Sequence, residues 1–371
     1  MAAGIARQFA IYGDFIGAAP FGSGHINDTF RSEWNQAGTI VRYTHQRINR
    51  RVFARPDEVM ENIVRVTSHI ASKHRAAGEW SRRSLTVVPT GDGKPWARDG
   101  EGGWWRTYLF IENAHSLEKT SSVAEARFLG ASIGRFQKQL ADLPAPRLHD
   151  TIPHFHDMEM RYLRFYDALK KDSHNRAPDA AAEIDFMVKN EERGGILVAA
   201  QREGRIPERI CHNDTKINNI LIDDVTLDAL CVIDLDTVMP GTVLFDTGDL
   251  IRTVAATAAE DERDLSKVHF DLSFYEGLLE GYLSEALEFL GREEIKLITE
   301  SGRNITQIMA LRFLTDFLEG DCYYHTSRPR HNLDRCRNQI ALIRSMDSMW
   351  EDALKIARKP GSSLSWRYFE Q

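Results

Sequence analysis

Three polar residues between positions 210 and 249 have the types and the spacing that phosphoryl transfer to a hydroxyl group requires. Asp214 lies in a polar turn, Asn219 follows five residues later, and Asp234 comes directly after the apolar run 229–233. Such a reaction needs a carboxylate that orients the acceptor hydroxyl and takes its proton, and it needs hard oxygen ligands for magnesium. Asp214 suits the first role, and Asn219 and Asp234 suit the second.

The joint pattern carries this prediction, because a lone acidic residue in a turn usually caps or braces nearby backbone. The chain reads His212-x-Asp214-x4-Asn219-Ile-Leu, and an apolar strand that ends in Ile233-Asp-Leu-Asp236 follows. We therefore expect a short strand, a catalytic loop, a second strand and a metal-binding loop. Within the catalytic loop His212 is expected to brace the backbone. Lys216 either approaches the transferred phosphoryl group or is simply exposed.

A glycine-containing segment near the N-terminus could bind nucleotide phosphates. Gly22, Ser23 and Gly24 lie between two apolar stretches and predict a strand–turn–strand whose backbone amides can approach a phosphate. An ordinary hairpin turn is the alternative.

The β-branched and aromatic stretch 39–48 predicts a strand that ends in a basic region. Arg47 at its end could hold the α- and β-phosphates, and Arg42 is a competing candidate for that role. Glu61, on a helix that Pro56 opens, could pair with Arg47; an exposed side chain is the alternative.

The order of expected elements divides the chain into residues 1–112 and residues 113–371. Strands dominate the first part, where residues 85–111 read as a hairpin, and the second part is mostly helical. The change near Glu112 is expected to be a hinge that binds adenine. The fold class is therefore α+β, with a small β-rich N-terminal lobe and a large helical C-terminal lobe.

Composition limits the classes of function. The chain has 371 residues, of which 42% are hydrophobic, and a net charge of −7, so we expect a folded protein that does not bind nucleic acid. Its four cysteines show no CxxC pairing and indicate free thiols. We find no signal peptide and no apolar run long enough for a membrane span. We therefore expect a cytoplasmic protein without a membrane partner.

Together these motifs resemble the aminoglycoside phosphotransferase and choline-kinase branch of the protein-kinase-like fold, over nearly the whole chain. More narrowly, the chain is similar to the N-acetylhexosamine 1-kinases. The matching stretches are 21–30, 46–49 with 56–63, 214–219, 232–241 and 246–252.

This resemblance implies a two-lobed kinase that uses ATP and Mg²⁺ and phosphorylates the anomeric hydroxyl of GlcNAc or GalNAc. It implies that Asp214 is the base and that Asn219 and Asp234 hold the metal. It also implies that His25, Arg312 and Tyr323 face the sugar. One departure is Arg47, where a kinase normally has lysine, because a planar guanidinium contacts phosphate differently from an ammonium.

Other acceptors remain open, namely another sugar, choline, homoserine or an aminoglycoside, as does a non-catalytic nucleotide-binding scaffold. An aminoglycoside site should be rich in acidic residues. Arg312 lies in an otherwise apolar segment, so it must be paired or face a cleft. An ion pair with Asp316, four residues on, is one alternative. Asp246 and Asp249 are expected to cap the helix after the metal-binding loop or to brace the loop.

Overall fold

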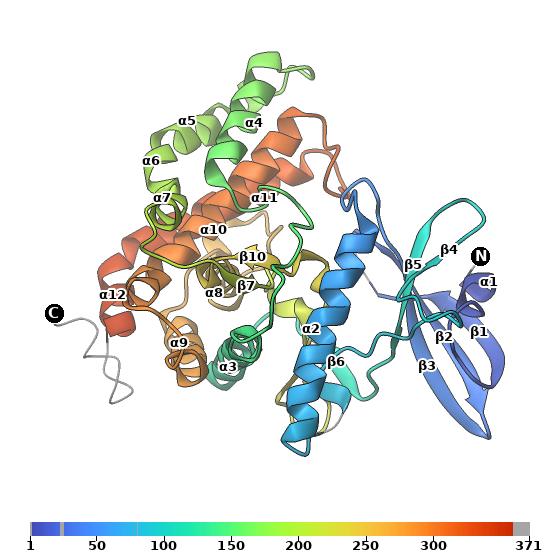
Figure 1. The fold of residues 1–371 in the computed structure, drawn as a ribbon. Coiled ribbons are helices and arrows are strands. Elements are labelled where there is room, and N and C mark those ends of the chain that lie inside the picture. The colour runs from blue at the N-terminus through green and yellow to red at the C-terminus, as the bar shows by residue number, and fades with distance from the viewer. Residues whose placement is uncertain (1, 23–25, 80, 359–371) are drawn as a thin grey trace. The chain divides into compact units, whose positions relative to one another are not determined.

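The structure is a computed structural model that describes residues 2–22, 26–79 and 81–358 (Figure 1). The chain forms two compact units, which are described one at a time. The N-terminal unit comprises Met1–His115, Asp142–Pro153 and Leu221–Met239, and the C-terminal unit comprises Ser116–Ala141, His154–Ile220 and Pro240–Gln371. The sequence indicated one boundary, near residue 112, and nothing in it indicated that two later segments join the N-terminal unit.

A five-stranded antiparallel sheet, in the order β1-β2-β3-β5-β4, forms the centre of the N-terminal unit (Figure 1). Its strands are β1 (Asp14–Pro20), β2 (Asp28–Gln36), β3 (Thr39–Arg47), β4 (Ala97–Arg98) and β5 (Trp104–Leu109). Alternating residues of β2, β3 and β5 bury one face of this sheet together with the helix α1 (Ala2–Ala6). That core contains Ile5, Phe9, Trp34, Tyr43 and Trp105.

The long helix of this unit, α2 (Pro56–Ala76), follows the predicted periodicity. Pro56 occupies its first turn, where a missing N–H leaves no intrahelical bond unmade. Its predicted apolar face is buried, with Val59, Ile63 and Val66 at most 1% exposed. The buried face holds the helix against its unit, so the face bearing Glu61 remains outside.

The expected hairpin at 85–111 has antiparallel pairing, with the Val88 N–H bonded to the Thr107 carbonyl and the Leu109 N–H to the Thr86 carbonyl, but its first half is not a regular strand. Only β4 and β5 pair as strands, and Val87 makes an isolated bridge to Tyr108. Pro89 has no N–H to donate to a ladder, and the chain turns directly afterwards, with the Thr90 N–H bonded to the Lys94 carbonyl. The segment before the turn therefore lies beside β5 without becoming a regular strand.

Two small sheets flank the chemistry-bearing stretch. One is three-stranded, with β6 (Ala114–Ser116), β8 (Ile220–Asp223) and β9 (Ala229–Val232) in the order β6-β8-β9. The other pairs β7 (Arg209–Cys211) with β10 (Met239–Gly241). The predicted alternation of short strands and polar loops is therefore present.

Helices make up most of the C-terminal unit. Those described are α3 (Val123–Leu140), α4 (Met158–Lys171), α5 (Ala181–Lys189), α6 (Glu191–Gly194), α7 (Ile196–Arg202), α8 (Val243–Val254), α9 (Leu272–Ala286), α10 (Arg292–Leu318), α11 (His331–Ser348) and α12 (Trp350–Arg358). The long helix α10, orange in Figure 1, packs against α4, α8 and α11.

The contact of α8 with α10 is unusually close, because a Cβ atom added at Gly248 would lie 2.4 Å from the Ser301 carbonyl oxygen. A larger residue would push the two helices apart. Gly248 therefore fixes the position of α8, which carries Asp246 and Asp249.

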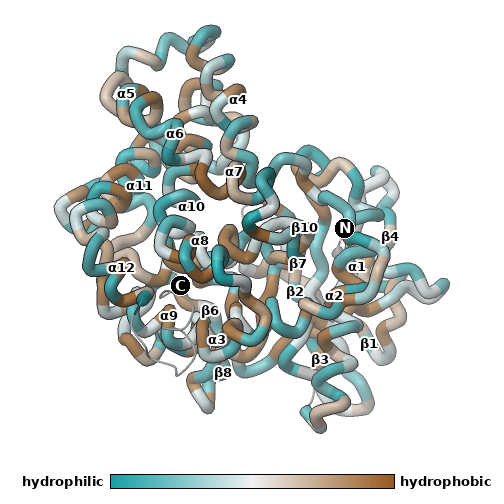
Figure 2. The backbone as a smooth tube through the Cα atoms, turned by 60° about the vertical axis from the view of Figure 1, so that its left-hand side comes forward, coloured by the Kyte–Doolittle hydropathy of each residue, from teal (hydrophilic) through white to brown (hydrophobic). Residues whose placement is uncertain are grey.

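Hydrophilic and hydrophobic residues alternate along the helices, as Figure 2 shows for α4 and α11. Within the described ranges, no helix combines the length and the apolar character that a membrane crossing requires.

Candidate active site

Asp246 braces the loop of the C-terminal unit that contains Asp214. The loop leaves β7, and the carboxylate of Asp246 accepts the backbone N–H groups of His212 (3.0 Å) and Asn213 (2.6 Å). Gln137 donates to the same carboxylate (2.9 Å), and Thr215 donates to the Asp246 carbonyl (2.6 Å). Asp246 is fully buried, so these donors replace the water it has lost. The bracing role that the sequence suggested is therefore present.

Neither acidic residue of α8 caps the helix, because Thr242 is the N-cap and accepts the Leu244 N–H. Asp249 instead lies in the middle of α8, buried against Arg252, with 2.8 Å between Asp249 Oδ1 and Arg252 Nε. Arg252 in turn bonds Glu260 (2.7 Å). The capping expectation is wrong for both acidic residues.

Asp214 and Asn219 are brought together by the loop. The Asn219 amide group donates to the Asp214 carbonyl (2.7 Å) and to its carboxylate (3.1 Å). Lys216 Nζ lies 3.1 Å from the same carboxylate, whose side chain is 30% exposed. Burial works against ionisation, but Lys216 and His212 hold the pKa of Asp214 below its ordinary value. Asp214 is therefore a carboxylate at neutral pH, and it can accept a proton.

The loop that follows β9 in the N-terminal unit exposes one of its two aspartates and buries the other. Asp234 has left-handed backbone angles (φ 61°, ψ 56°) and opens the short 3-10 helix η4 (Leu235–Thr237). The side chain of Asp234 is exposed, whereas Leu235 and Asp236 are buried. Of the two acidic residues in this motif, Asp234 is the one that a dissolved cation can reach.

Asp236 is held by an arginine that the sequence interpretation missed. Arg106, on β5, donates to both carboxylate oxygens of Asp236, with 2.9 Å from Nη2 to Oδ2, and both side chains are at most 3% exposed. Arg106 also donates twice to Gln46 (2.7 and 2.9 Å), and Asn27 donates to Asp236 (2.6 Å). The signal was a charged residue inside the apolar strand WWRTYL, because such a charge must find a partner.

The expected pairing of Arg47 with Glu61 is wrong. Arg47 lies 3.3 Å from Glu101 and 3.6 Å from Asp99, both in the same unit. Glu61 instead hydrogen-bonds His149 (3.0 Å), because its face of α2 is turned toward the segment that contains this histidine.

The competing strand cation, Arg42, pairs with Glu33 (2.9 Å) and with Glu112 (3.1 Å) at the expected hinge. Both candidate cations are thus engaged by carboxylates. Gly22 has a φ of +80°, which favours glycine, and Ser23, Gly24 and His25 lie outside the described residues.

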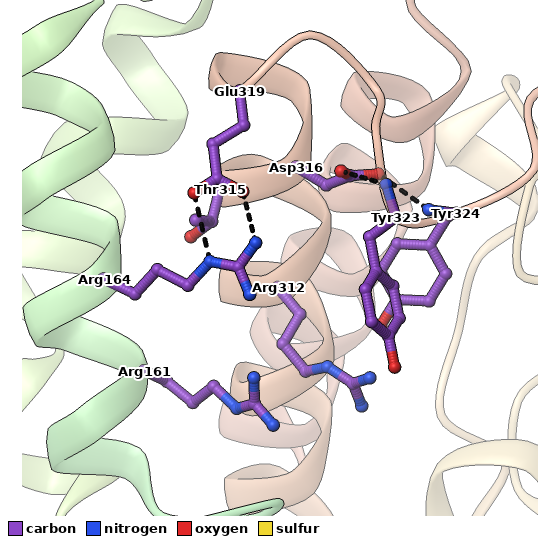
Figure 3. Close-up of a pocket in the computed structure, with 8 residues that line it drawn as sticks. All are labelled: Arg161, Arg164, Arg312, Thr315, Asp316, Glu319, Tyr323 and Tyr324. Atoms are coloured by element: carbon purple, nitrogen blue, oxygen red, sulfur yellow. Dashed lines mark hydrogen bonds and ion pairs between the residues drawn. The ribbon is translucent and has the colours of Figure 1, made fainter. Parts of the chain in front are cut away.

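A pocket in the C-terminal unit contains two of the expected sugar-facing residues (Figure 3). It is lined by Arg161, Arg164, Arg312, Thr315, Asp316, Glu319, Tyr323 and Tyr324. The guanidinium carbon of Arg312 lies 5.7 Å from the ring centroid of Tyr323, 5.4 Å from that of Tyr324 and 4.9 Å from that of Phe155. Arg312 and Tyr323 therefore share one pocket, while His25 cannot be placed.

Asp316 does not pair with Arg312. Its carboxylate accepts the backbone N–H groups of Cys322 (2.9 Å), Tyr323 (2.8 Å) and Tyr324 (3.0 Å), and a bond from Asn332 (2.8 Å). Asp316 therefore holds the turn after α10 and positions both tyrosines. The alternative of an Arg312–Asp316 ion pair is not observed.

The pocket and Asp214 belong to the same unit, and Arg312 interacts electrostatically with the Asp214 carboxylate. Burial disfavours the charge of Arg312, but Tyr324, Tyr323 and Asp214 raise its pKa above the ordinary value. His156, which the sequence interpretation missed, contacts the loop that contains Asp214, and its Nε2 is 2.8 Å from the Asn213 carbonyl oxygen. Burial lowers the pKa of His156 to about 3, so this side chain is neutral and donates to the loop.

Residues 17–290 match the model of a family described as the phosphotransferase enzyme family. The chain belongs to this family. It is therefore a phosphotransferase, in agreement with an ionised Asp214 held beside Asn219 and Lys216.

Solved structures resemble the chain at low sequence identity. An aminoglycoside phosphotransferase from Alicyclobacillus acidocaldarius is 12% identical, with a TM-score of 0.55 and 96% of each chain covered. An ethanolamine kinase from Plasmodium vivax is 13% identical, with a TM-score of 0.56, covering 87% of this chain and 82% of that one. A choline/ethanolamine kinase family protein from Mesorhizobium loti is 18% identical, with a TM-score of 0.53, covering 96% and 98%. These similarities confirm the predicted fold class.

Proposed function

We propose that this phosphotransferase is a kinase that uses ATP and Mg²⁺ and transfers the γ-phosphoryl group to the anomeric hydroxyl of an N-acetylhexosamine. The observation that supports the choice of acceptor is the arginine- and tyrosine-lined pocket, whose Arg312 interacts electrostatically with Asp214. Family membership supports the reaction type, and the pocket supports the class of acceptor.

Asp214 acts as the base in this proposal. It orients the acceptor hydroxyl and takes its proton while the anomeric oxygen forms a bond to the γ-phosphorus. The bond between that phosphorus and the oxygen leading to the β-phosphate breaks, and ADP leaves. The contact with Lys216 supports this role, because it keeps Asp214 ionised and places a cation beside the reacting carboxylate.

Asn219 and Asp234 are proposed to hold the magnesium, which would neutralise charge on the phosphate oxygens. Both present hard oxygen atoms, and the amide N–H groups of Asn219 are occupied by Asp214, which leaves its amide oxygen for a cation. Within residues 2–22, 26–79 and 81–358, no cluster of three or more His, Cys, Asp or Glu side chains could hold a metal. Two protein ligands agree with magnesium, because this ion keeps water and substrate phosphates as its other ligands.

The nucleotide is proposed to contact the segment Gly22–Gly24 and the residues Arg47, Glu61 and Glu112. Arg42 is the alternative to Arg47. Each of these two arginines would have to exchange a carboxylate for a phosphate, and their partial exposure supports such an exchange.

The acceptor pocket disfavours cationic acceptors such as choline, ethanolamine and aminoglycosides. Its two carboxylates are already engaged, Asp316 by backbone N–H groups and Glu319 by Arg164 (2.6 Å). A sugar fits better, because guanidinium groups donate to hydroxyl and acetamido oxygens and tyrosine rings offer flat apolar surfaces. Arg312 and Tyr323 are proposed to make these contacts, together with His25.

The test is an acceptor panel with Mg·ATP. GlcNAc and GalNAc are compared with choline, ethanolamine, homoserine and kanamycin, ADP release is measured, and the product is identified by phosphorus NMR. We expect the two N-acetylhexosamines to yield sugar 1-phosphates. Turnover with a cationic acceptor but with neither sugar would contradict the proposal.

A further inference from the structure

The acceptor pocket carries more positive charge than its own carboxylates neutralise. Three arginines line it, and one of them, Arg164, is paired with Glu319. In the remaining carboxylate, Asp316, both oxygens accept hydrogen bonds, three from backbone N–H groups and one from Asn332. Among the described residues, neither Arg161 nor Arg312 lies within 4.0 Å of a carboxylate oxygen. Two guanidinium charges in the pocket therefore have no paired carboxylate among the described residues.

Arg161 and Arg312 are close enough to repel each other. Burial and then Arg312 lower the pKa of Arg161 to about 10, so it remains charged at neutral pH but at a cost in free energy. Partly buried like charges are unfavourable unless something compensates them. A binding site can keep such an arrangement, because its ligand supplies the missing charge.

Phe155 holds both groups in place. Its carbonyl oxygen accepts Nε (3.1 Å) and Nη2 (2.5 Å) of Arg161, and its ring centroid lies 5.9 Å from the guanidinium carbon of Arg161 and 4.9 Å from that of Arg312. Figure 3 shows the two guanidinium groups projecting from α4 and α10 toward the same space. Among the described residues, Nη1 of Arg161 makes no hydrogen bond to an oxygen atom, and Nη1 of Arg312 lies 3.5 Å from the sulfur of Met309. A planar guanidinium fork of this kind suits an oxyanion.

We propose that Arg161 and Arg312 form an anion subsite, and that the preferred acceptor is an N-acetylhexosamine carrying a phosphate ester or a sulfate ester. This inference rests on the proposed function, because it places that acceptor in this pocket. The two esters share the chemistry that the guanidinium pair recognises, a tetrahedral oxyanion. The transfer step is unchanged, since the ester takes no part in bond making.

The test compares neutral and anionic acceptors. For the wild-type protein, kcat/KM is measured with GlcNAc, GlcNAc 6-phosphate and GlcNAc 6-sulfate. We expect the better ester to exceed GlcNAc by at least about 10-fold, as for a hydrogen bond to a charged group. In Arg161→Gln this ratio should fall toward 1, and in Arg161→Lys, which keeps the charge and loses the fork, it should be intermediate. The relative rates of the two esters show which anion is preferred.

A matched control is Arg202→Gln, which removes the same charge from an exposed site on α7, where Arg202 pairs with Glu159. This variant should keep the wild-type ratio, and the melting temperature of each variant reports whether it is folded. An equal or better rate with neutral GlcNAc, unchanged in Arg161→Gln, would overturn the inference and leave the proposed function intact.

Two further outcomes are decided by binding. If no sugar is phosphorylated, the proposed function fails, and calorimetry of GlcNAc 6-phosphate with wild type and Arg161→Gln then decides the subsite by itself. Binding that Arg161→Gln weakens supports the subsite, and no binding overturns it. If inorganic sulfate or phosphate competes as well as the sugar esters do, the subsite takes a free anion, and the acceptor assignment is overturned.

Discussion

One arginine of the N-terminal unit and two arginines of the C-terminal pocket differ in how the protein matches their charge. In the N-terminal unit Arg106 gives two hydrogen bonds to Asp236 and two to Gln46, and its charge is fully matched. In the C-terminal unit Arg161 and Arg312 lie beside each other, with a backbone carbonyl, a methionine sulfur and aromatic rings as their contacts. A charge that the protein neutralises itself stabilises the fold, whereas one that it leaves unmatched is available to a ligand. The comparison separates residues that stabilise the structure from residues that we propose contact the acceptor.

The largest effect is expected on breaking the matched pair. Arg106→Met leaves Asp236 buried without its main partner and should lower the free energy of unfolding by about 3–5 kcal/mol. The double variant Arg106→Met/Asp236→Leu should recover much of that loss, because an apolar pair of similar volume needs no counter-charge. Urea denaturation measures the free energy of unfolding of the single and the double variant. A single variant as stable as wild type would contradict the structural role of this pair.

The next largest effect is expected at the base. Asp214→Asn removes the proton acceptor and should lower kcat by at least about 10²-fold, the usual size for a lost general base. Nucleotide affinity should stay nearly unchanged, because the proposed phosphate contacts lie on other residues. Single-turnover kinetics with a separate measurement of ATP binding tests this. Full activity in the variant would refute the assignment.

A smaller effect is expected when the turn that positions Tyr323 and Tyr324 loses the carboxylate that holds it. Asp316→Ala leaves three backbone N–H groups without their acceptor and should raise KM for the acceptor by about 10-fold, since a hydrogen bond to a charged group contributes about 1.5–3 kcal/mol. The kcat should change less, because Asp214 is braced separately by Asp246.

Glu319→Gln is the matched control for Asp316→Ala. It removes a carboxylate from the same pocket but breaks only a partly exposed pair with Arg164, so its effect on stability should stay below about 1 kcal/mol. Equal KM values for Asp316→Ala and wild type would show that the turn does not need this carboxylate.

The smallest expected effect is a shift in the dependence of kcat/KM on pH. Because Lys216 and His212 hold the pKa of Asp214 below its ordinary value, the base stays ionised as pH falls, and kcat/KM should decline only below the usual aspartate range. Lys216→Met removes the ammonium group beside Asp214, so the pKa of Asp214 should rise and the acid limb should move to higher pH. A profile of kcat/KM against pH for both proteins measures the shift. A shift in the opposite direction would contradict the role of Lys216.

Local parts of the site were accessible from the sequence. Asp214 and Asn219 are five residues apart, so the loop that joins them also brings them together. The periodicity of α2 likewise depends only on neighbouring residues. Patterns of this kind need no knowledge of distant segments.

Contacts between distant segments could not be predicted in this way. Arg106 bonds to Asp236 across a sequence separation of 130 residues, and Glu61 bonds to His149 across a separation of 88 residues. The sequence indicated that a charge in an apolar strand or helix needs a partner, but the identity of the partner depends on packing. An ion pair of Arg312 with Asp316, four residues on, was one of two alternatives; Asp316 instead holds the turn that follows α10.

The return of Leu221–Met239 to the N-terminal unit has a consequence for biosynthesis. When Arg106 leaves the ribosome, its counter-charge has not yet been made, and at about 5–20 residues per second the 130 residues that end with Asp236 take roughly 6–26 seconds. A nascent chain that ends near residue 112 would have to bury this guanidinium alone, which is unfavourable. The first lobe should therefore finish folding only after much of the second has been translated.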